Sequence, residues 1–179
     1  MELDTVLENR RSIRQYKEGQ MISKEMVEQL IDAAILAPSW KNSQTGRYYV
    51  VSSKEMLEKV KRECLPEFDQ ESSKNAPVLI ITAFEKNRSG FTREGKEENE
   101  LGNGWGCYDL GLQSENLLLK ATELGLGTLV MGIRNSEKIR ELLSIPDTQE
   151  IVSVIAVGYF DTSVDKPKRK DVNDITKFY

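Results

Sequence analysis

Apolar residues recur at helical spacing in several parts of the chain. The spacing predicts a short helix at residues 3–7, a helix between Ser23 and Pro38, and a helix opened by a capping box of Ser52 and Glu55. Ser23 is the expected N-cap of the second helix, and the apolar stripe of that helix should face the core. This stripe consists of Val27, Leu30, Ile31, Ala34 and Ile35.

Apolar runs of strand length alternate with these helices. They occur at residues 47–51, 76–84, 128–133 and 151–160. The run at 76–84 is apolar at nearly every position, which predicts burial on both faces of a sheet that helices cover. A further helix is expected between the last two runs, around Ile139.

The longest predicted helix spans residues 105–124. Its apolar side chains occur on several faces, which is typical of a buried helix. In a chain of this size, such a helix either passes through the centre of the domain or packs against a second subunit. Because no repeat or linker divides the sequence, we expect one domain over residues 1–179.

A charged, glycine-containing stretch at about residues 85–104 interrupts the apolar pattern and has no clear period beyond a short helix at most. Stretches of this length inside compact domains are often lids or binding segments, although a solvated insertion fits equally well. We expect this segment to border the substrate entrance.

Composition places the chain among soluble globular proteins. It has 179 residues, of which 39% are hydrophobic and 30% charged, and a net charge of -4. Such an acidic chain is not expected to attract nucleic acid or an anionic membrane. No apolar run approaches the roughly 20 residues that span a bilayer, and the acidic start at residues 1–4 is unlike a signal peptide. A cytoplasmic location is therefore expected.

The chain contains no histidine and only two cysteines, Cys64 and Cys107. The missing histidine excludes Ser–His–acid triads, Cys–His dyads and histidine-ligated zinc or iron. The two distant cysteines give no support to a disulfide framework or a zinc ribbon. An enzyme of this sequence must therefore use carboxylate, lysine, tyrosine or cysteine chemistry, or a bound cofactor.

Three arginines and a serine cluster near the start of the chain, in the order Arg10, Arg11, Ser12, Ile13, Arg14. Arginine presents paired donors that match phosphate oxygens and stays charged, while the serine adds a neutral donor. The cluster therefore suits a phosphate. A solvated helix end explains it as well, because cations interact favourably with the negative end of the helix dipole.

Together with three later segments, this cluster resembles the nitroreductase family of FMN-dependent, NAD(P)H-using oxidoreductases along nearly the whole chain. The resemblance implies an α+β fold with a central, mostly antiparallel sheet covered by helices, a long buried central helix and a dimeric arrangement. The residues that it assigns to the flavin phosphate, ribityl chain and pyrimidine edge are Arg10, Arg11, Ser12 and Arg14.

The second matching segment is the loop Ala37-Pro38-Ser39-Trp40-Lys41-Asn42-Ser43-Gln44, similar to the family's A-P-S-x-x-N-S-Q loop. Its polar side chains can read the uracil-like edge of a flavin ring. After the loop the chain has Thr45-Gly46, where the family commonly has Pro-Trp, and a plain capping loop is the alternative interpretation. By resemblance, the residues that serve the neighbouring subunit's cofactor are Pro38, Ser39, Trp40 and Asn42.

The third segment is the turn Gly125-Leu126-Gly127-Thr128 with the strand after it. Alone, such glycines more often form a left-handed helix C-cap. By resemblance, the strand lies beside the flavin ring and offers a backbone N–H toward N5; the matching positions are Val130, Met131 and Gly132. The fourth segment is a basic run in the C-terminal tail that resembles the family's phosphate-holding segment; its residues are Lys168, Arg169 and Lys170.

The resemblance implies tightly bound FMN, NAD(P)H as co-substrate and ping-pong transfer of electrons to nitroaromatics, quinones or similar electron-poor acceptors. No side chain is required as an acid or base, so we name no catalytic residue. The expected assembly is a homodimer with shared active sites. Candidates for an aromatic wall of the acceptor pocket, each also explained by ordinary packing, are Trp40, Phe91, Trp105 and Tyr108.

Two other classes of function remain open at this point. One is a flavin-binding protein of the same fold without nitroreductase activity, such as a dehalogenase, a flavin-consuming enzyme or a flavin carrier. The other is a non-enzymatic nucleotide-binding module whose arginine cluster holds a different ligand. A flavin spectrum of the purified protein separates the second class from the rest.

Overall fold

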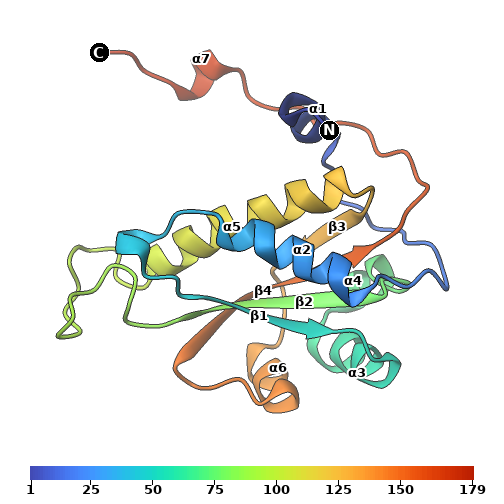
Figure 1. Cartoon of the computed structure of the whole chain (residues 1–179), viewed down its shortest axis with the longest axis horizontal. Helices are drawn as coiled ribbons and strands as arrows, with labels where there is room; N and C mark the ends of the chain where they lie inside the picture. Colours follow the sequence, from blue (N-terminus) through green and yellow to red (C-terminus); the bar gives the residue numbers. More distant parts are fainter.

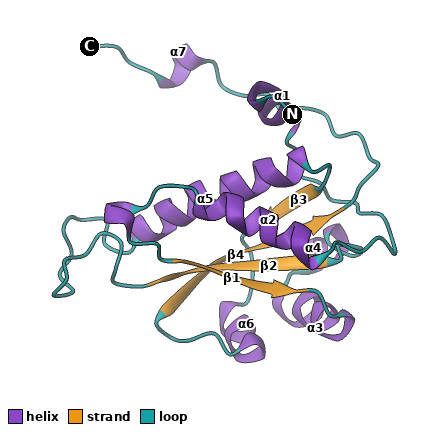
Figure 2. Ribbon diagram, in the orientation of Figure 1, coloured by secondary structure: helices purple, strands orange, loops and turns teal.

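The computed structural model describes all residues from 1 to 179 and has a four-stranded sheet at its centre (Figure 2). The strand order is β1-β2-β4-β3, and every neighbouring pair is antiparallel. This arrangement confirms the expected α+β fold. The strands are β1 (Gly46–Val51), β2 (Val78–Glu85), β3 (Gly127–Met131) and β4 (Gln149–Gly158).

Helices cover both faces of the sheet. On one face lie α2 (Lys24–Ile35) and α5 (Gly104–Glu123), and on the other lie α3 (Lys54–Cys64) and α6 (Ser136–Leu143) (Figure 1). The apolar core is accordingly divided into two clusters, one on each side of the sheet. The remaining elements are short: α1 (Leu3–Asn9), the 3-10 helix η1 (Trp40–Asn42), α4 (Glu67–Ser72) and α7 (Val172–Ile175).

Strand β2 explains the continuous apolar run at residues 76–84. It pairs with β1 on one side and β4 on the other, and all of its residues except Glu85 are buried. Because helices pack on both faces, neither set of alternating side chains meets water, so both sets are apolar. The expected burial on both faces is therefore confirmed.

Two helix starts show how local chemistry fixes the element boundaries. Ser23 caps α2 as expected, since its side chain accepts a hydrogen bond from the Met26 N–H. The expected cap at Ser52 is wrong by one residue, because Ser53 accepts from the Met56 N–H instead. Ser52 is the link between β1 and this cap.

The apolar stripes of α1 and α2 are narrower than the sequence pattern indicates. In α1 only Val6 is buried, while Leu3 and Leu7 are exposed. In α2 the stripe continues from Val27 to Ala34, but Ile35 at the end of the helix is 61% exposed. The expectation of a core position for Ile35 is therefore wrong within a single chain.

Helix α5 has one buried face and one exposed face in a single chain, and its buried face is not uniformly apolar. In its C-terminal half Leu117 and Ala121 pack in the core, whereas in its N-terminal half Asp109 and Gln113 are buried and Leu112 is partly exposed.

No helix of the chain combines the length and apolar character needed to cross a membrane.

The C-terminal tail leaves the sheet after β4 and runs past α1 before it forms α7 (Figure 1). Nearly every side chain from residue 161 onward is exposed. A single contact fastens the tail to α1, an ion pair between Lys166 and Glu8. The last residues therefore extend away from the body of their own chain.

Candidate functional site

The arginine cluster lies beside the start of β3. The Ile13 N–H donates to the Thr128 carbonyl at 2.8 Å, and Ser12 forms a parallel bridge with Thr128. Ile13 is buried, and the hydroxyl of the buried Tyr16 donates to the Ile13 carbonyl at 2.9 Å. These apolar anchors hold the backbone while the arginine side chains remain at or near the surface.

The arginine cluster begins where α1 ends. That helix ends at Asn9, its last turn contains no basic residue, and Arg10 is its C-cap residue. Their environment leaves positive charge available: Arg10 Nε lies 3.8 Å from a carboxylate oxygen of Glu115, whereas no carboxylate lies within ion-pair distance of Arg11 or Arg14. A cluster with free guanidinium donors suits an anionic phosphate.

The free edge of β3 adjoins this cluster. The Thr128 carbonyl points away from β4, because it accepts a hydrogen bond from the Ile13 N–H. In a strand, the backbone N–H and C=O groups of residues two positions apart point in the same direction. The Val130 N–H is therefore directed to the open edge of the sheet, where the Val130 side chain is 46% exposed. Met131 is buried, and Gly132 follows the end of the strand.

Glycines in the turn before β3 have two different roles. Gly125 has a φ of +74° after the end of α5, which is the left-handed cap that the glycine pattern alone indicates. Gly127 permits close packing, because a Cβ there would lie 2.7 Å from Ile13 Cγ1 and 2.8 Å from Phe160 Cδ1. Gly127 thus lets the arginine cluster approach β3.

The loop after α2 contains an unusual run of backbone conformations. Lys41, Asn42 and Gln44 all have positive φ, at 46°, 55° and 50°. Residues other than glycine seldom adopt this region, and such strain clusters at binding sites and active sites. The Ser39 hydroxyl supports the turn by accepting from the Gln44 N–H at 3.1 Å.

Buried polar atoms without a hydrogen-bond partner occur mainly in and next to the two segments predicted to bind the cofactor, Arg10–Arg14 and the loop at residues 37–44. Only five buried side-chain nitrogen or oxygen atoms in the chain have no hydrogen-bond partner: Arg11 Nε, Trp40 Nε1, Ser43 Oγ, Thr45 Oγ1 and Arg134 Nε. Buried polar groups are normally satisfied, so three such atoms in these two segments, with Thr45 directly after the loop, indicate a missing polar partner. The unpartnered Arg11 Nε, within the arginine cluster, fits the phosphate of a flavin.

Within one chain these two segments lie toward opposite ends of α5 (Figure 1). Arg10 approaches Glu115, whereas the Trp40 N–H donates to Asp109 near the start of the helix. No hydrogen bond or ion pair joins Arg10–Arg14 to the loop at residues 37–44. A single chain therefore does not assemble all of the expected cofactor residues in one place.

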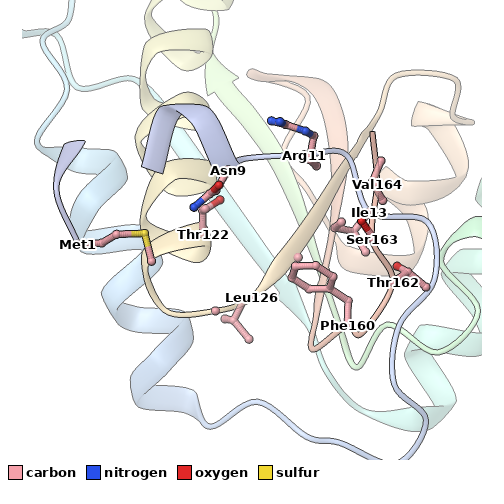
Figure 3. A pocket seen from close by; sticks show the side chains of 12 residues that line it. Met1, Asn9, Arg11, Ile13, Thr122, Leu126, Phe160, Thr162, Ser163 and Val164 are labelled. Atoms are coloured by element: carbon pink, nitrogen blue, oxygen red, sulfur yellow. The ribbon is translucent and has the colours of Figure 1, made fainter. Parts of the chain in front are cut away.

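The tail approaches the arginine cluster through its first residues rather than its basic run. Ser163 and Val164 line a cavity of about 320 Å³ together with Arg11, Ile13 and Leu126 (Figure 3). The basic residues lie further along the tail and are exposed, with no hydrogen bond to the cluster; they are Lys168, Arg169 and Lys170.

Three of the four aromatic candidates pack together beside the strained loop. The Trp40 and Trp105 ring centroids are 4.5 Å apart, and Trp105 lies 5.5 Å from Tyr108. Phe91 is instead part of a short bridge with Glu97 in the stretch between β2 and α5. That stretch contains no helix.

Asp109, a buried carboxyl group at the centre of this region, is not among the residues predicted from the sequence. Its Oδ2 accepts from the Trp40 N–H at 3.0 Å and from the Ser89 hydroxyl at 2.5 Å. The signal available in the sequence is the spacing of Asp109 and Gln113, which lie four residues apart on one face of the helix, next to the apolar Leu110 and Leu117.

Comparisons with known proteins agree with this architecture. The family model described as the nitroreductase family matches residues 7–159. A protein of Methanothermobacter thermautotrophicus, provisionally named NADH dehydrogenase/NAD(P)H nitroreductase, is 31% identical and covers 97% of this chain and 84% of its own length. A Bacillus subtilis protein named FMN reductase (NAD(P)H) is 30% identical over 90% of this chain and 68% of its own.

Solved structures show the same fold. The crystal structure of a nitroreductase family protein from Clostridium difficile 630 aligns with a TM-score of 0.79 and 26% identity, over 99% of this chain and 98% of that one. The sheet, the helices on its two faces and the match over residues 7–159 lead to one assignment: this chain belongs to the nitroreductase family.

Proposed function

We propose that this protein is an FMN-dependent oxidoreductase that takes electrons from NAD(P)H and passes them, in a ping-pong cycle, to nitroaromatics, quinones or similar electron-poor acceptors. The names of its relatives, which include an NAD(P)H nitroreductase and an FMN reductase, support this class. The observation that carries the proposal is the open edge of β3 beside an arginine cluster whose donors are largely free.

Arg10, Arg11 and Arg14 would hold the phosphate, and Ser12 would reach the ribityl chain. The outward Val130 N–H would donate to the ring at the strand edge. When bound, FMN supplies the hydride acceptance and the electron transfer. The positive cluster stabilises negative charge on its ligand, and this effect is strong where water is excluded. No histidine is present to move protons, and water would supply the protons of the reduced product without any side chain acting as an acid.

A homodimer with shared sites accounts for the separation of the two segments. Pro38, Ser39, Trp40 and Asn42 of one subunit would face the cofactor held by the arginines of the other. Several large apolar side chains are exposed in one chain and would be available to such an interface. They include Leu7, Ile35, Leu36 and Leu112.

The tail fits the same dimer. Because it extends past α1 and away from its own sheet, Lys168, Arg169 and Lys170 would complete the phosphate surroundings only when the two subunits are together. This placement predicts that the basic run contributes to FMN affinity without any contact to its own chain's arginines.

The test begins with the purified protein. Its absorbance should show a flavin, denaturation should release FMN, and light scattering should give the mass of two chains. Anaerobic mixing with NADH or NADPH should bleach the flavin band, and an added quinone should restore it. Colourless protein whose Tm does not rise with FMN would overturn the proposal, because a ligand at about 100 times its Kd adds about 2.7 kcal/mol to stability.

The name of the Bacillus subtilis relative favours a second candidate, in which free FMN is itself an acceptor. Steady-state oxidation of NAD(P)H distinguishes the two. If added FMN accelerates turnover and leaves the solution as reduced flavin, the protein is a flavin reductase; if only quinones or nitroaromatics do so, the first proposal holds.

A further inference from the structure

Three polar side chains form a stripe along α5 that is not explained by cofactor contacts. Asp109, Gln113 and Asn116 follow one another at spacings of four and three residues, which places them on one face of the helix. We name Asp109, Gln113 and Asn116 the polar stripe.

Each member of the polar stripe fastens a different point of one connection, residues 33–48. Asn116 Nδ2 donates to the Ala33 carbonyl at 3.2 Å, at the end of α2. Gln113 Oε1 accepts from the Tyr48 hydroxyl at 2.7 Å, in β1. Asp109 holds the middle, because its Oδ2 accepts from the Trp40 N–H. The strained loop is thus anchored before, within and after its turn.

Asp109 also reaches the stretch between β2 and α5, which we name segment 86–103. The same Oδ2 accepts from Ser89, and the Asp109 residue is only 3% exposed. Burying a hydrogen-bond acceptor without a donor raises the free energy of the folded protein, so the buried Asp109 carboxyl group depends on these hydrogen bonds. One carboxyl oxygen therefore joins segment 86–103, the loop and α5.

Two further contacts connect the loop with segment 86–103. Lys41 Nζ lies 2.5 Å from Glu98 Oε1, and the Trp105 indole N–H donates to Asn99 Oδ1 at 2.9 Å while its ring packs on Trp40. These contacts link the loop to segment 86–103 both directly and through Trp105 of α5.

The positive φ values of the loop require this support. Lys41 and Asn42 follow the Trp40 N–H that Asp109 accepts, and strained residues persist only where their surroundings hold them. The bond to Asp109 is the only one from the loop's N–H groups to a side chain outside the loop.

We propose that Asp109 is a positioning residue that locks loop 39–44 and segment 86–103 to α5 as one unit, and so sets the shape of the surface that this unit presents to flavin and electron acceptor. The role in acceptor handling rests on the proposed function. Asp109 acts through Trp40 and Ser89 and is assigned no contact with substrate and no proton transfer.

The chain offers a direct spectroscopic test, because Trp40 and Trp105 are its only two tryptophans and they pack against each other. Asp109→Ala should abolish the near-UV circular dichroism of the tryptophan pair and leave the far-UV spectrum unchanged. Asp109→Asn should keep the near-UV signal, since the amide oxygen can accept the same two hydrogen bonds.

Binding and turnover provide the second readout. For Asp109→Ala we expect the FMN Kd to rise and kcat/KM for a quinone to fall by about 10- to 100-fold, because small displacements of positioning groups have effects of this size. Asp109→Asn should stay within about twofold of the unsubstituted protein. Thermal unfolding of both variants separates positioning from a general loss of fold.

Several results would overturn the proposal. Asp109→Ala could retain the tryptophan signal and the FMN Kd, or Asp109→Asn could lose as much as Asp109→Ala. If Asp109→Ala does not fold, Ser89→Ala provides the test. In Ser89→Ala, trypsin should cleave after Arg93 and Lys96 faster than in the unsubstituted protein. An unchanged cleavage rate would contradict the proposal that Asp109 holds segment 86–103 in place. If the protein binds no FMN, the proposed function is wrong. The near-UV dichroism and the tryptic cleavage would still test the positioning role of Asp109.

Discussion

Arg10 and Arg14 belong to one cluster but differ in how freely their guanidinium groups can bind a phosphate. The Arg10 side chain is 21% exposed and lies near Glu115, so part of its charge is offset. Arg14 is exposed, and its only hydrogen bond is a long one of 3.4 Å to the Ser12 carbonyl. Arg14 therefore has the freer guanidinium group of the two.

We expect Arg14→Ala to raise the FMN Kd by about 10- to 100-fold, the effect of losing hydrogen bonds to a charged group. Riboflavin, which lacks the phosphate, is the matched ligand and should bind both proteins equally. Fluorescence titration measures both values. Equal weakening of the two flavins would show that Arg14 does not contact the phosphate.

Gly127 is the residue that allows the arginine cluster to lie against β3. A methyl group there would overlap Ile13 and Phe160, so Gly127→Ala should lower the free energy of unfolding by about 1–3 kcal/mol and displace the cluster. In Gly104→Ala the new Cβ would meet only Leu101, at an ordinary 3.6 Å. Urea unfolding of the two variants should therefore differ, and equal effects would contradict the close approach.

At the scale of elements, neighbouring tyrosines in β1 provide a matched pair for the polar stripe. The Tyr48 hydroxyl donates to Gln113 at 2.7 Å, and the Tyr49 hydroxyl donates to Gln149 at 2.6 Å on the opposite face of the sheet. Each hydrogen bond should contribute about 0.5–1.5 kcal/mol to stability.

Tyr48→Phe and Tyr49→Phe should therefore destabilise the fold by similar amounts. Only Tyr48→Phe should alter the near-UV dichroism of the tryptophan pair, because only Tyr48 anchors the connection that carries Trp40. The two urea midpoints and the two spectra are the measurements. A spectral change in Tyr49→Phe alone would refute the role given to Gln113.

Elements with a sustained apolar period could be predicted from the sequence. The four strands and the helices α2, α3, α5 and α6 lie where the pattern places them, with boundaries shifted by a few residues. The helices α4 and α7, of six and four residues, are too short to show a period. Local hydrogen bonding, as at Ser53, decides boundaries that periodicity leaves open.

The candidate site was predictable only in part. Arg10–Arg14 and the loop at residues 37–44 stand out through side-chain chemistry and a family resemblance. Asp109 did not, because a carboxylate in an amphipathic pattern normally marks the solvated face of a helix. Its burial depends on the Trp40 N–H and on Ser89, which are distant in sequence.

At the scale of the whole molecule, buried titrating groups give stability a defined dependence on pH. Burial raises the pKa of Tyr48 to about 12 and that of Cys64 to about 11, and it raises the pKa of Tyr16 as well. Burial lowers the pKa of Lys61 to about 8. At alkaline pH the tyrosines and the cysteine therefore change the free energy of unfolding in the opposite direction to Lys61.

A group whose pKa is raised by folding stabilises fully below its unfolded value, and this contribution is lost as the pH rises through the folded value. For Lys61 the sign is reversed, so stability increases between pH 8 and 10.5. We expect the free energy of unfolding to change little up to about pH 8, to rise between about pH 8 and 9 as the Lys61 contribution appears, and to fall beyond about pH 10 as the tyrosine contributions are lost.

Urea unfolding between about pH 7 and about pH 11 tests this expectation. Tyr16→Phe removes one titrating group and one hydrogen bond to Ile13, so it should be less stable than the unsubstituted protein at neutral pH. Its decline above about pH 10 should be shallower. An equally steep decline would assign the alkaline loss to other groups.

The free edge of β3 has a consequence outside catalysis. A strand edge with unpaired N–H and C=O groups is a template on which another chain can add a strand, and natural proteins cover such edges. Here Ile13 covers only the position of Thr128. In the proposed dimer with bound flavin the remaining groups would be covered, so a newly made chain that lacks both would be more open to aggregation and proteolysis at this edge.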